Sequence, residues 1–213
     1  MEIRFDKVMP EPLSTMVHNE ESIWGASFTL SKGQKVMLNA SSGKGKTTFT
    51  HLIAGIRKDF AGDIFFSDKR IKTLSPDEYA KIRKAKIAFI FQDLQLFPAL
   101  TVKENLLLKN QLTTTFSESE IKAFINQLEI GDKWDTPCKL LSMGQQQRVA
   151  IVRAICQPFD WLIMDEPFSH LDKENINKCL DLIQKRCEEL SAGFVITSLG
   201  EDHGVKFDKI LKL

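Results

Sequence analysis

The chain has 213 residues, of which 43% are hydrophobic and 27% are charged, a composition that favours a packed core over disorder. Its 29 Lys and Arg residues nearly balance its 28 Asp and Glu residues, so charge gives no support to a nucleic-acid partner. The amino terminus lacks the apolar core of a signal peptide, and no apolar run approaches the ~18 residues of a membrane span. We therefore expect a cytoplasmic protein that serves a membrane only through a partner.

Six apolar runs of strand length occur in chain order, at residues 35–39, 63–67, 86–92, 161–165, 194–198 and 209–213. Several are apolar at consecutive positions, a pattern typical of strands that are buried on both faces of a parallel sheet. Helices alternate with these runs. Ser75, Ser117 and Ser142 each begin a capping box, with Glu or Gln three residues later. A fourth helix begins near Lys173. The pattern predicts an α/β fold with a helical block from about residue 100 to residue 156.

Four cysteines occur without a C-x-x-C pair. Cys179 and Cys187 fall two turns apart on one predicted helix, which is too far for a disulfide. The sequence predicts buried, reduced thiols, as in a cytosolic protein.

The segment NASSGKGKTT, residues 39–48, follows the first of these runs and precedes a predicted helix. It matches the phosphate-loop pattern G-x-x-x-x-G-K-[ST] except that Ala40 replaces the first glycine. In such a loop, backbone N–H groups surround a triphosphate, the lysine adds a positive charge, and the Thr hydroxyl binds Mg²⁺. The alternative is a turn that closes a βα unit beside a solvated lysine. The predicted nucleotide-binding residues are Ala40, Ser41, Ser42, Gly43, Lys44, Gly45, Lys46, Thr47 and Thr48.

A pair of acids, Asp165 and Glu166, ends the apolar run WLIMD at 161–165. In a parallel sheet this end faces the same crevice as the phosphate loop. Asp165 can then belong to the Mg²⁺ shell, and Glu166 can deprotonate an attacking water. The alternative is an ordinary strand end with two solvated acids.

The segment KLLSMGQQQRVAIVRAI, residues 139–155, lies between these two sites. It resembles the L-S-G-G-Q signature of the ATP-binding cassette (ABC) ATPases. Gln92 in FIFQD matches the Q-loop of that family, and SHLD at 169–172 resembles its D-loop. The resemblance covers nearly the whole chain. It is strongest to the short cassettes of lipoprotein-releasing, macrolide-export and cell-division systems.

The resemblance implies a single ABC domain over residues 1–213. Its P-loop NTPase core, at about 1–92 and 157–213, would hold a mostly parallel sheet and a small N-terminal antiparallel β region. A helical lobe would be inserted at about 93–156. The ligands would be ATP and Mg²⁺. The resemblance implies three further sets of residues: catalytic Glu166, Gln92 and Lys46; metal-binding Thr47, Gln92 and Asp165; and Ser142, Gly144, Gln145 and Asp172 at the nucleotide of a second subunit in a head-to-tail dimer.

The chain departs from the family pattern at four places around the nucleotide. Ala40 and Met143 replace glycines. No aromatic residue lies between Asp6 and Ser22 to stack on adenine, so one of Pro10, Pro12 and Leu13 would have to pack there. Ser198 or Leu199 stands where the family has a histidine after its last core strand. His203 follows four or five residues later, and we expect that Gly200 does not turn the chain enough to bring it back.

Three functions fit these observations. The first is an ATP-driven motor for an integral membrane permease, peripheral on the inner face of the membrane. The second is an ATP-gated dimerisation switch with little hydrolysis, and the third is a soluble ABC scaffold ATPase without a transport role. For the first, the surface at 92–101 would contact the permease, and we expect Phe97 or Leu100 to be exposed there.

Overall fold

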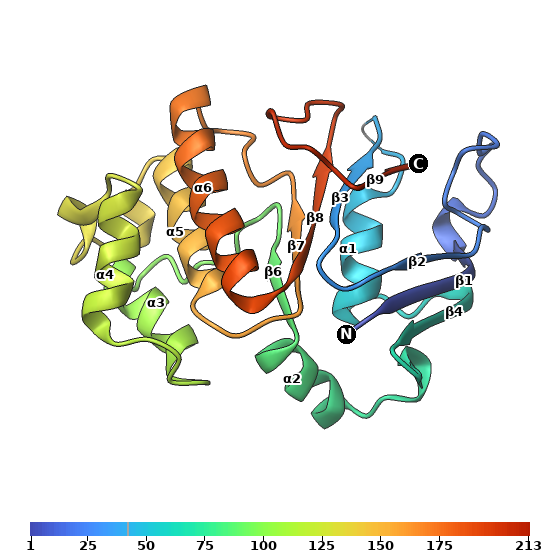
Figure 1. The fold of residues 1–213 in the computed structure, drawn as a ribbon, viewed down its shortest axis with the longest axis horizontal. Coiled ribbons are helices and arrows are strands. Elements are labelled where there is room, and N and C mark those ends of the chain that lie inside the picture. Colours follow the sequence, from blue (N-terminus) through green and yellow to red (C-terminus); the bar gives the residue numbers. More distant parts are fainter. Residues whose placement is uncertain (42) are drawn as a thin grey trace.

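The computed structural model describes residues 1–41 and 43–213. The molecule consists of two β-sheets and the helices around them (Figure 1). The larger sheet is parallel throughout. Its strands lie in the order β6 (Ile87–Ile90), β7 (Trp161–Asp165), β8 (Gly193–Ser198), β3 (Lys35–Asn39) and β9 (Lys209–Lys212). The smaller sheet is antiparallel, in the order β2 (Phe28–Leu30), β1 (Ile3–Pro10), β4 (Phe60–Phe66) and β5 (Lys69–Arg70). The predicted α/β fold with a small antiparallel region is confirmed.

Both faces of the parallel sheet are buried, which explains its consecutive apolar residues. On β7, Leu162 and Met164 belong to a core shared with α5 (Met143–Ile155) and α6 (Lys173–Leu190). Trp161 and Ile163 face the opposite core, which includes α1 (Lys46–Ala54). Figure 1 shows α1 between the two sheets, with α5 and α6 on the far side of the parallel sheet. Each strand therefore buries side chains in both directions.

The predicted helix starts are confirmed. Ser75 caps α2 (Pro76–Ala85), Ser117 caps α4 (Glu118–Gln127) and Ser142 caps α5, each in a complete capping box. A fourth capping box was not predicted: Thr101 caps α3 (Val102–Asn110) through Glu104. Four short 3₁₀ helices complete the described elements, at Glu11–Leu13, Ile71–Thr73, Gly131–Lys133 and Cys138–Leu140.

Two predicted strands differ from the structure by two or more residues at one end. The run at 63–67 begins three residues earlier, as β4, because Phe60 and Ala61 pair with Pro10 and Met9 of β1. The run at 86–92 pairs only as Ile87–Ile90, so Phe91 and Gln92 lie beyond the sheet. The helices α3, α4 and α5 follow in the chain before β7. The division into a core and a lobe at residues 92 and 157 remains our proposal.

All four cysteines are buried and free, as predicted. No helix within the described residues is both long and apolar enough to cross a bilayer.

The parallel strands β3, β6, β7 and β8 all end at one edge of the sheet. The chain leaves this edge at Asn39, Ile90, Asp165 and Ser198, so the predicted phosphate loop, Gln92 and Glu166 are brought together there.

Candidate nucleotide-binding site

The loop between β3 and α1 is supported from below by two side chains. Gly45 is the N-cap of α1 with φ 105°, a left-handed conformation that favours glycine. A Cβ at Gly45 would lie 2.7 Å from Leu13 Cδ1 and 3.2 Å from the Trp24 ring. Trp24 Nε1 also donates a hydrogen bond to the carbonyl of Lys44 at 3.2 Å. Trp24 thus packs under the loop. Sequence reasoning missed this role, because residue 24 lies 20 positions upstream in no recognisable motif.

A cavity of about 300 Å³ opens above this loop. The predicted residues Gly43, Gly45, Lys46, Thr47 and Thr48 line it together with Gln92 and Glu166, and Leu13 and Leu199 complete its wall. The structure therefore brings Gln92 and Glu166 to the loop, as the sequence predicted. Leu13 is the one of the three candidate base-packing residues that lines the cavity. The predicted Ser42 lies outside the described residues.

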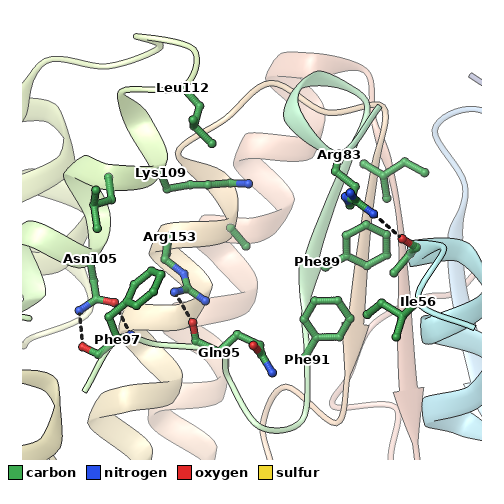
Figure 2. A pocket seen from close by; sticks show the side chains of 14 residues that line it. Ile56, Arg83, Phe89, Phe91, Gln95, Phe97, Asn105, Lys109, Leu112 and Arg153 are labelled. Atoms are coloured by element: carbon green, nitrogen blue, oxygen red, sulfur yellow. Dashed lines mark hydrogen bonds between the residues drawn. The ribbon is translucent and has the colours of Figure 1, made fainter. Parts of the chain in front are cut away.

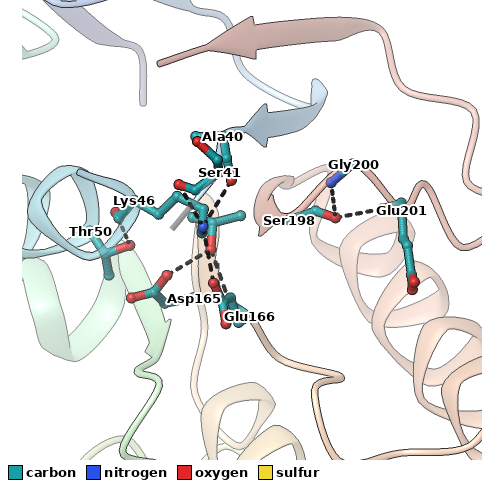
Figure 3. A network of polar contacts seen from close by, with 10 residues as sticks. Ala40, Ser41, Lys46, Thr50, Asp165, Glu166, Ser198, Gly200 and Glu201 are labelled. Atoms are coloured by element: carbon teal, nitrogen blue, oxygen red, sulfur yellow. Dashed lines mark hydrogen bonds and ion pairs between the residues drawn. The ribbon is translucent and has the colours of Figure 1, made fainter. Parts of the chain in front are cut away.

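The Lys46 ammonium lies at the centre of the polar contacts around this cavity (Figure 3). It donates to the carbonyls of Ala40 at 2.9 Å and Ser41 at 3.3 Å, and it lies 3.2 Å from Glu166 Oε1. Ala40 is not among the described residues with positive φ, so its methyl group causes no backbone strain there. Buried Lys46 and the Glu166 carboxylate form an ion pair. An anionic ligand would have to compete with Glu166 for the lysine.

Thr197 holds the two acids after β7. Its Oγ1 donates to Asp165 Oδ1 at 2.7 Å and accepts the backbone N–H of Glu166 at 3.0 Å. Glu166 has φ 48°, an uncommon conformation for a residue with a side chain. Sequence reasoning missed Thr197. The signal was available in the strand order, because parallel pairing places Thr197 opposite Asp165.

Asp165 leaves one oxygen free for a ligand. Its Oδ2 is buried and has no hydrogen-bond partner among the described residues, which is costly unless a ligand or water satisfies it. Within those same residues, no group of three or more His, Cys, Asp or Glu side chains could hold a metal by itself. Magnesium commonly takes one or two protein oxygens and completes its shell with phosphate and water. Thr47 and Gln92 line the cavity, whereas Asp165 is buried and does not line it. These oxygens, with the unpartnered oxygen of Asp165, are of the kind that magnesium takes.

The signature segment forms the amino end of α5. Ser142 Oγ accepts the N–H of Gln145 at 3.3 Å, and Gln145 Oε1 accepts the N–H of Ser142 at 3.0 Å. A Cβ on Gly144 would lie only 2.8 Å from the carbonyl oxygen of His170. Met143 is exposed. Among the described residues, none from this segment lines the cavity at the phosphate loop, so these groups would have to serve a different nucleotide.

A buried glutamine connects α5 to the segment that follows the acids. Gln147 Nε2 donates to Ser169 Oγ at 2.9 Å, and its Oε1 accepts the backbone N–H of His170 at 3.0 Å. Asp172 ends this segment as the N-cap of α6, where its Oδ1 accepts the N–H of Asn175 at 2.9 Å. That hydrogen bond lowers the pKa of Asp172. In this structure Asp172 therefore caps a helix. Its contact with the nucleotide of a second subunit remains a prediction.

Ser198 is the last residue of β8. It is one of the two residues that stand where the family has a histidine. Its hydroxyl donates to the carbonyl of Glu201 at 2.8 Å and accepts the N–H of Gly200 at 3.1 Å, which fixes the turn that follows. His203 lies against Phe168, with ring centroids 5.2 Å apart and nearly perpendicular rings. It lines a neighbouring cavity of about 290 Å³ that Glu166 also lines. That His203 does not reach the phosphates remains a prediction.

A glycine loop before a helix, a buried lysine and an Asp-Glu pair at the edge of a parallel sheet define a P-loop nucleoside triphosphatase. The family model described as ABC transporter matches residues 23–169. The chain therefore belongs to the ABC transporter family, and it is an ATP-binding ATPase subunit of that family.

Characterised relatives agree with the predicted subgroup. The chain is 34% identical over 186 residues to the lipoprotein-releasing system ATP-binding protein LolD of Buchnera aphidicola, covering 86% of this chain and 80% of the relative. It is 30% identical to LolD of Francisella tularensis, covering 88% of this chain and 83% of the relative. It is also 34% identical to the macrolide export ATP-binding/permease protein MacB of Campylobacter jejuni, covering 76% of this chain but 26% of that longer protein.

Solved structures of the bacterial ABC transporter cassette MJ0796 share the fold. A dimeric structure is 25% identical with a TM-score of 0.83, covering 99% of this chain and 94% of the other. A dimeric post-hydrolysis state bound to ADP and Pi is 27% identical with a TM-score of 0.81, at the same coverage.

Proposed function

We propose that this subunit hydrolyses ATP with Mg²⁺ to drive an integral membrane permease. Backbone N–H groups at 43–47 and the amino end of α1 would bind the phosphates, because both present unpaired donors to an anion. Lys46 would exchange its contact with Glu166 for the β- and γ-phosphates. The observation that carries this proposal is the cavity in which the loop, Gln92 and Glu166 meet.

Glu166 is the proposed general base. It would accept a proton from water as the water oxygen attacks the γ-phosphorus and the bond to the β-phosphate oxygen breaks, giving ADP and phosphate. Thr47, Gln92 and Asp165 would hold Mg²⁺, which offsets the negative charge that develops on the phosphate oxygens. Leu13 would pack against the base as an apolar surface without aromatic stacking.

The active form is proposed to be a head-to-tail homodimer or a pair with a second cassette. Ser142, Gly144 and Gln145 lie away from the phosphate loop of their own chain, so the amino end of α5 would meet the nucleotide of the other subunit. The dimeric state of MJ0796 supports this arrangement. Met143 would lie at the same interface, since it is exposed in the single chain.

A membrane partner is proposed to bind at residues 92–101. The expectation that Phe97 or Leu100 is exposed is confirmed, because Phe97 is 55% exposed. The relative MacB carries permease and ATP-binding functions under one name, which supports a permease partner here. The chain would then lie on the inner face of the cell membrane.

The test is phosphate release by the purified chain and by Glu166→Gln, at saturating ATP and Mg²⁺. We expect the variant to bind ATP and to lose at least about 100-fold in kcat, because the substitution removes the proton acceptor and keeps the shape. Asp181→Asn, on the exposed face of α6, is the matched control and should keep wild-type activity. An unchanged rate in Glu166→Gln would exclude Glu166 as the base.

A second candidate function is a nucleotide-gated switch with little hydrolysis. The observation that favours it is Ser198, whose hydroxyl is already engaged within its own turn. A switch would dimerise with ATP and release phosphate at a negligible rate with or without membranes. Rapid turnover by the wild type would reject the switch.

A further inference from the structure

The indole ring of Trp24 lies beneath the phosphate loop, in a segment that both sheets hold in place. Ile23 donates its backbone N–H to the carbonyl of Lys212 in β9 at 2.9 Å, and Gly25 donates to the carbonyl of Val8 in β1 at 2.7 Å. Trp24 is 5% exposed and packs in the core that includes α1. The ring is therefore fixed relative to the two sheets.

The ring contacts the loop through its N–H. Trp24 Nε1 donates to the carbonyl of Lys44 at 3.2 Å. A Cβ at Gly45 would lie 3.2 Å from the same Nε1, so a side chain there would crowd the ring. Trp24 is buried and does not line the cavity at the phosphate loop. The Lys44 carbonyl therefore points into the protein and away from that cavity.

The orientation of the Lys44 carbonyl sets the direction of the next backbone N–H. The peptide bond between Lys44 and Gly45 is trans, so its C=O and N–H point in opposite directions. The following peptide group is fixed in the same way, because the carbonyl of Gly45 accepts the N–H of Phe49 at 2.9 Å in the first turn of α1. The N–H groups of Gly45 and Lys46 therefore both point toward the cavity, which these two residues line.

Two N–H groups that already point at the cavity are suited to a phosphate. Within the described residues, neither N–H donates to the protein itself. Donors at the amino end of a helix attract anions, and donors that are oriented in advance bind more tightly, because no free energy is spent on turning them. If the peptide group rotated, the Lys44 carbonyl oxygen would face the phosphates and repel them. Holding that carbonyl inward thus favours the ligand.

The other groups at the cavity have supports of their own. Arg153 donates to the carbonyl of Gln95 at 2.6 Å, in the loop that carries Gln92 (Figure 2). Thr197 Oγ1 accepts the backbone N–H of Glu166 at 3.0 Å. Neither contact involves the indole. A change at the indole N–H should therefore alter the phosphate loop and leave the proposed general base in place.

We infer that Trp24 is a positioning residue for phosphate binding: its indole N–H holds the Lys44 carbonyl inward and so directs the N–H of Gly45 at a phosphate oxygen of ATP. The inference rests on the proposed function, since it takes the phosphates to bind at this loop. The alternative is that Trp24 only fills the core, where a buried indole N–H needs some acceptor. Loss of the N–H would then lower stability and leave the affinity for nucleotide unchanged.

The test compares Trp24→Phe with Trp161→Phe. Phenylalanine keeps a buried aromatic ring at position 24 and removes the N–H. We expect the KM for ATP and the calorimetric Kd for ADP to rise about three- to tenfold, the usual net effect of one hydrogen bond. The kcat should stay within about twofold of wild type, because the contact is the same before and during the reaction.

Trp161 provides the matched control. It is also buried, and its Nε1 donates to the carbonyl of Met1 at 2.9 Å. Trp161→Phe therefore loses the same kind of hydrogen bond away from the loop, and it should keep the wild-type KM.

A second variant at position 24 covers a loss of folding in Trp24→Phe. Benzothienylalanine has sulfur in place of the indole N–H and keeps the shape of the ring, and it should raise the KM by the same factor. Tripolyphosphate, which competes with a fluorescent ATP analogue, reports on phosphate binding without a base. Its Kd should rise in both variants as the Kd for ADP does.

Unchanged affinity in both Trp24 variants would overturn the inference. So would a loss of affinity for ADP without a loss for tripolyphosphate, which would assign Trp24 to the base, or a fall in kcat at unchanged KM. Lys46→Ala separates these results from the proposed function. If that variant binds ADP as tightly as wild type, the phosphates do not bind at this loop, and the proposed site itself is rejected.

Discussion

Thr197→Val removes the one hydroxyl that connects Asp165 to Glu166, while keeping the size and branching of the side chain. The hydroxyl donates to Asp165 Oδ1 and accepts the N–H of Glu166. Because Asp165 Oδ2 already lacks a partner among the described residues, the variant would leave the whole buried carboxylate without a hydrogen bond. A carboxylate in that state is free to rotate away from the position in which we propose that it binds Mg²⁺.

The expected loss of stability follows from these two contacts. A hydrogen bond to a charged group contributes roughly 1.5–3 kcal/mol and a neutral one about 1 kcal/mol, so Thr197→Val should lower the free energy of unfolding by about 2.5–4 kcal/mol. Thr197→Ser keeps the hydroxyl and loses one buried methyl group, which costs about 1 kcal/mol. Activity should fall about 10- to 100-fold in the valine variant, the usual effect of removing a group that orients a metal ligand.

Urea unfolding and phosphate release at saturating Mg²⁺ measure the two effects in the same preparations. We expect the serine variant to keep most of the activity and the valine variant to lose it. Equal activity in both variants, or a valine variant as stable as wild type, would refute the assignment of Thr197 as the positioning residue.

Three further outcomes are expected. Gly144→Ala should lower stability by about 1–3 kcal/mol in thermal unfolding, since its Cβ would press on the carbonyl of His170; an unchanged melting temperature would contradict the close contact. The Ser75 N–H and the Lys69 ammonium lower the pKa of Glu78 from 4.5 to about 2. The stability that this carboxylate adds is therefore present above pH 4.5 and lost as the pH falls towards 2. Glu78→Gln should be less stable than wild type near neutral pH, and the difference should vanish on acid titration followed by circular dichroism. Burial raises the pKa of three thiols to about 12 and raises that of a fourth, so a thiol reagent at pH 8 should modify none of them before unfolding: Cys156, Cys179, Cys187 and Cys138.

Local sequence signals predicted the fold well where they were physically strong. The two-sided burial of β7 and β8 required consecutive apolar residues, and Ser142 with Gln145 formed the capping box that its spacing indicated. The strand bounds were less predictable. Phe60 joins β4 only because β1 lies beside it, and this long-range pairing leaves no local mark in the sequence.

In the candidate site, too, local motifs predicted some residues, and residues that act through distant neighbours were missed. Lys46 and Glu166 were predicted from motifs, and both line the cavity. The supports beneath them were not predicted, because Trp24 and Thr197 act through neighbours that are distant in the chain. A motif names the groups that meet a ligand. The residues that hold those groups in place become visible only once the strands are ordered.

The double contact of Gln147 has a mechanical consequence. Breaking either of its buried hydrogen bonds would leave a polar group unsatisfied, at about 1–3 kcal/mol each, and Gly144 leaves no gap between the helix and the carbonyl of His170. These contacts couple the first turns of α5 to Ser169 and His170 in the segment that follows Glu166. In the dimer that we propose, a push on the exposed amino end of α5 would also move the stretch of chain that begins with Glu166. Arrival of the second subunit would thus be sensed at the proposed general base without any contact to it.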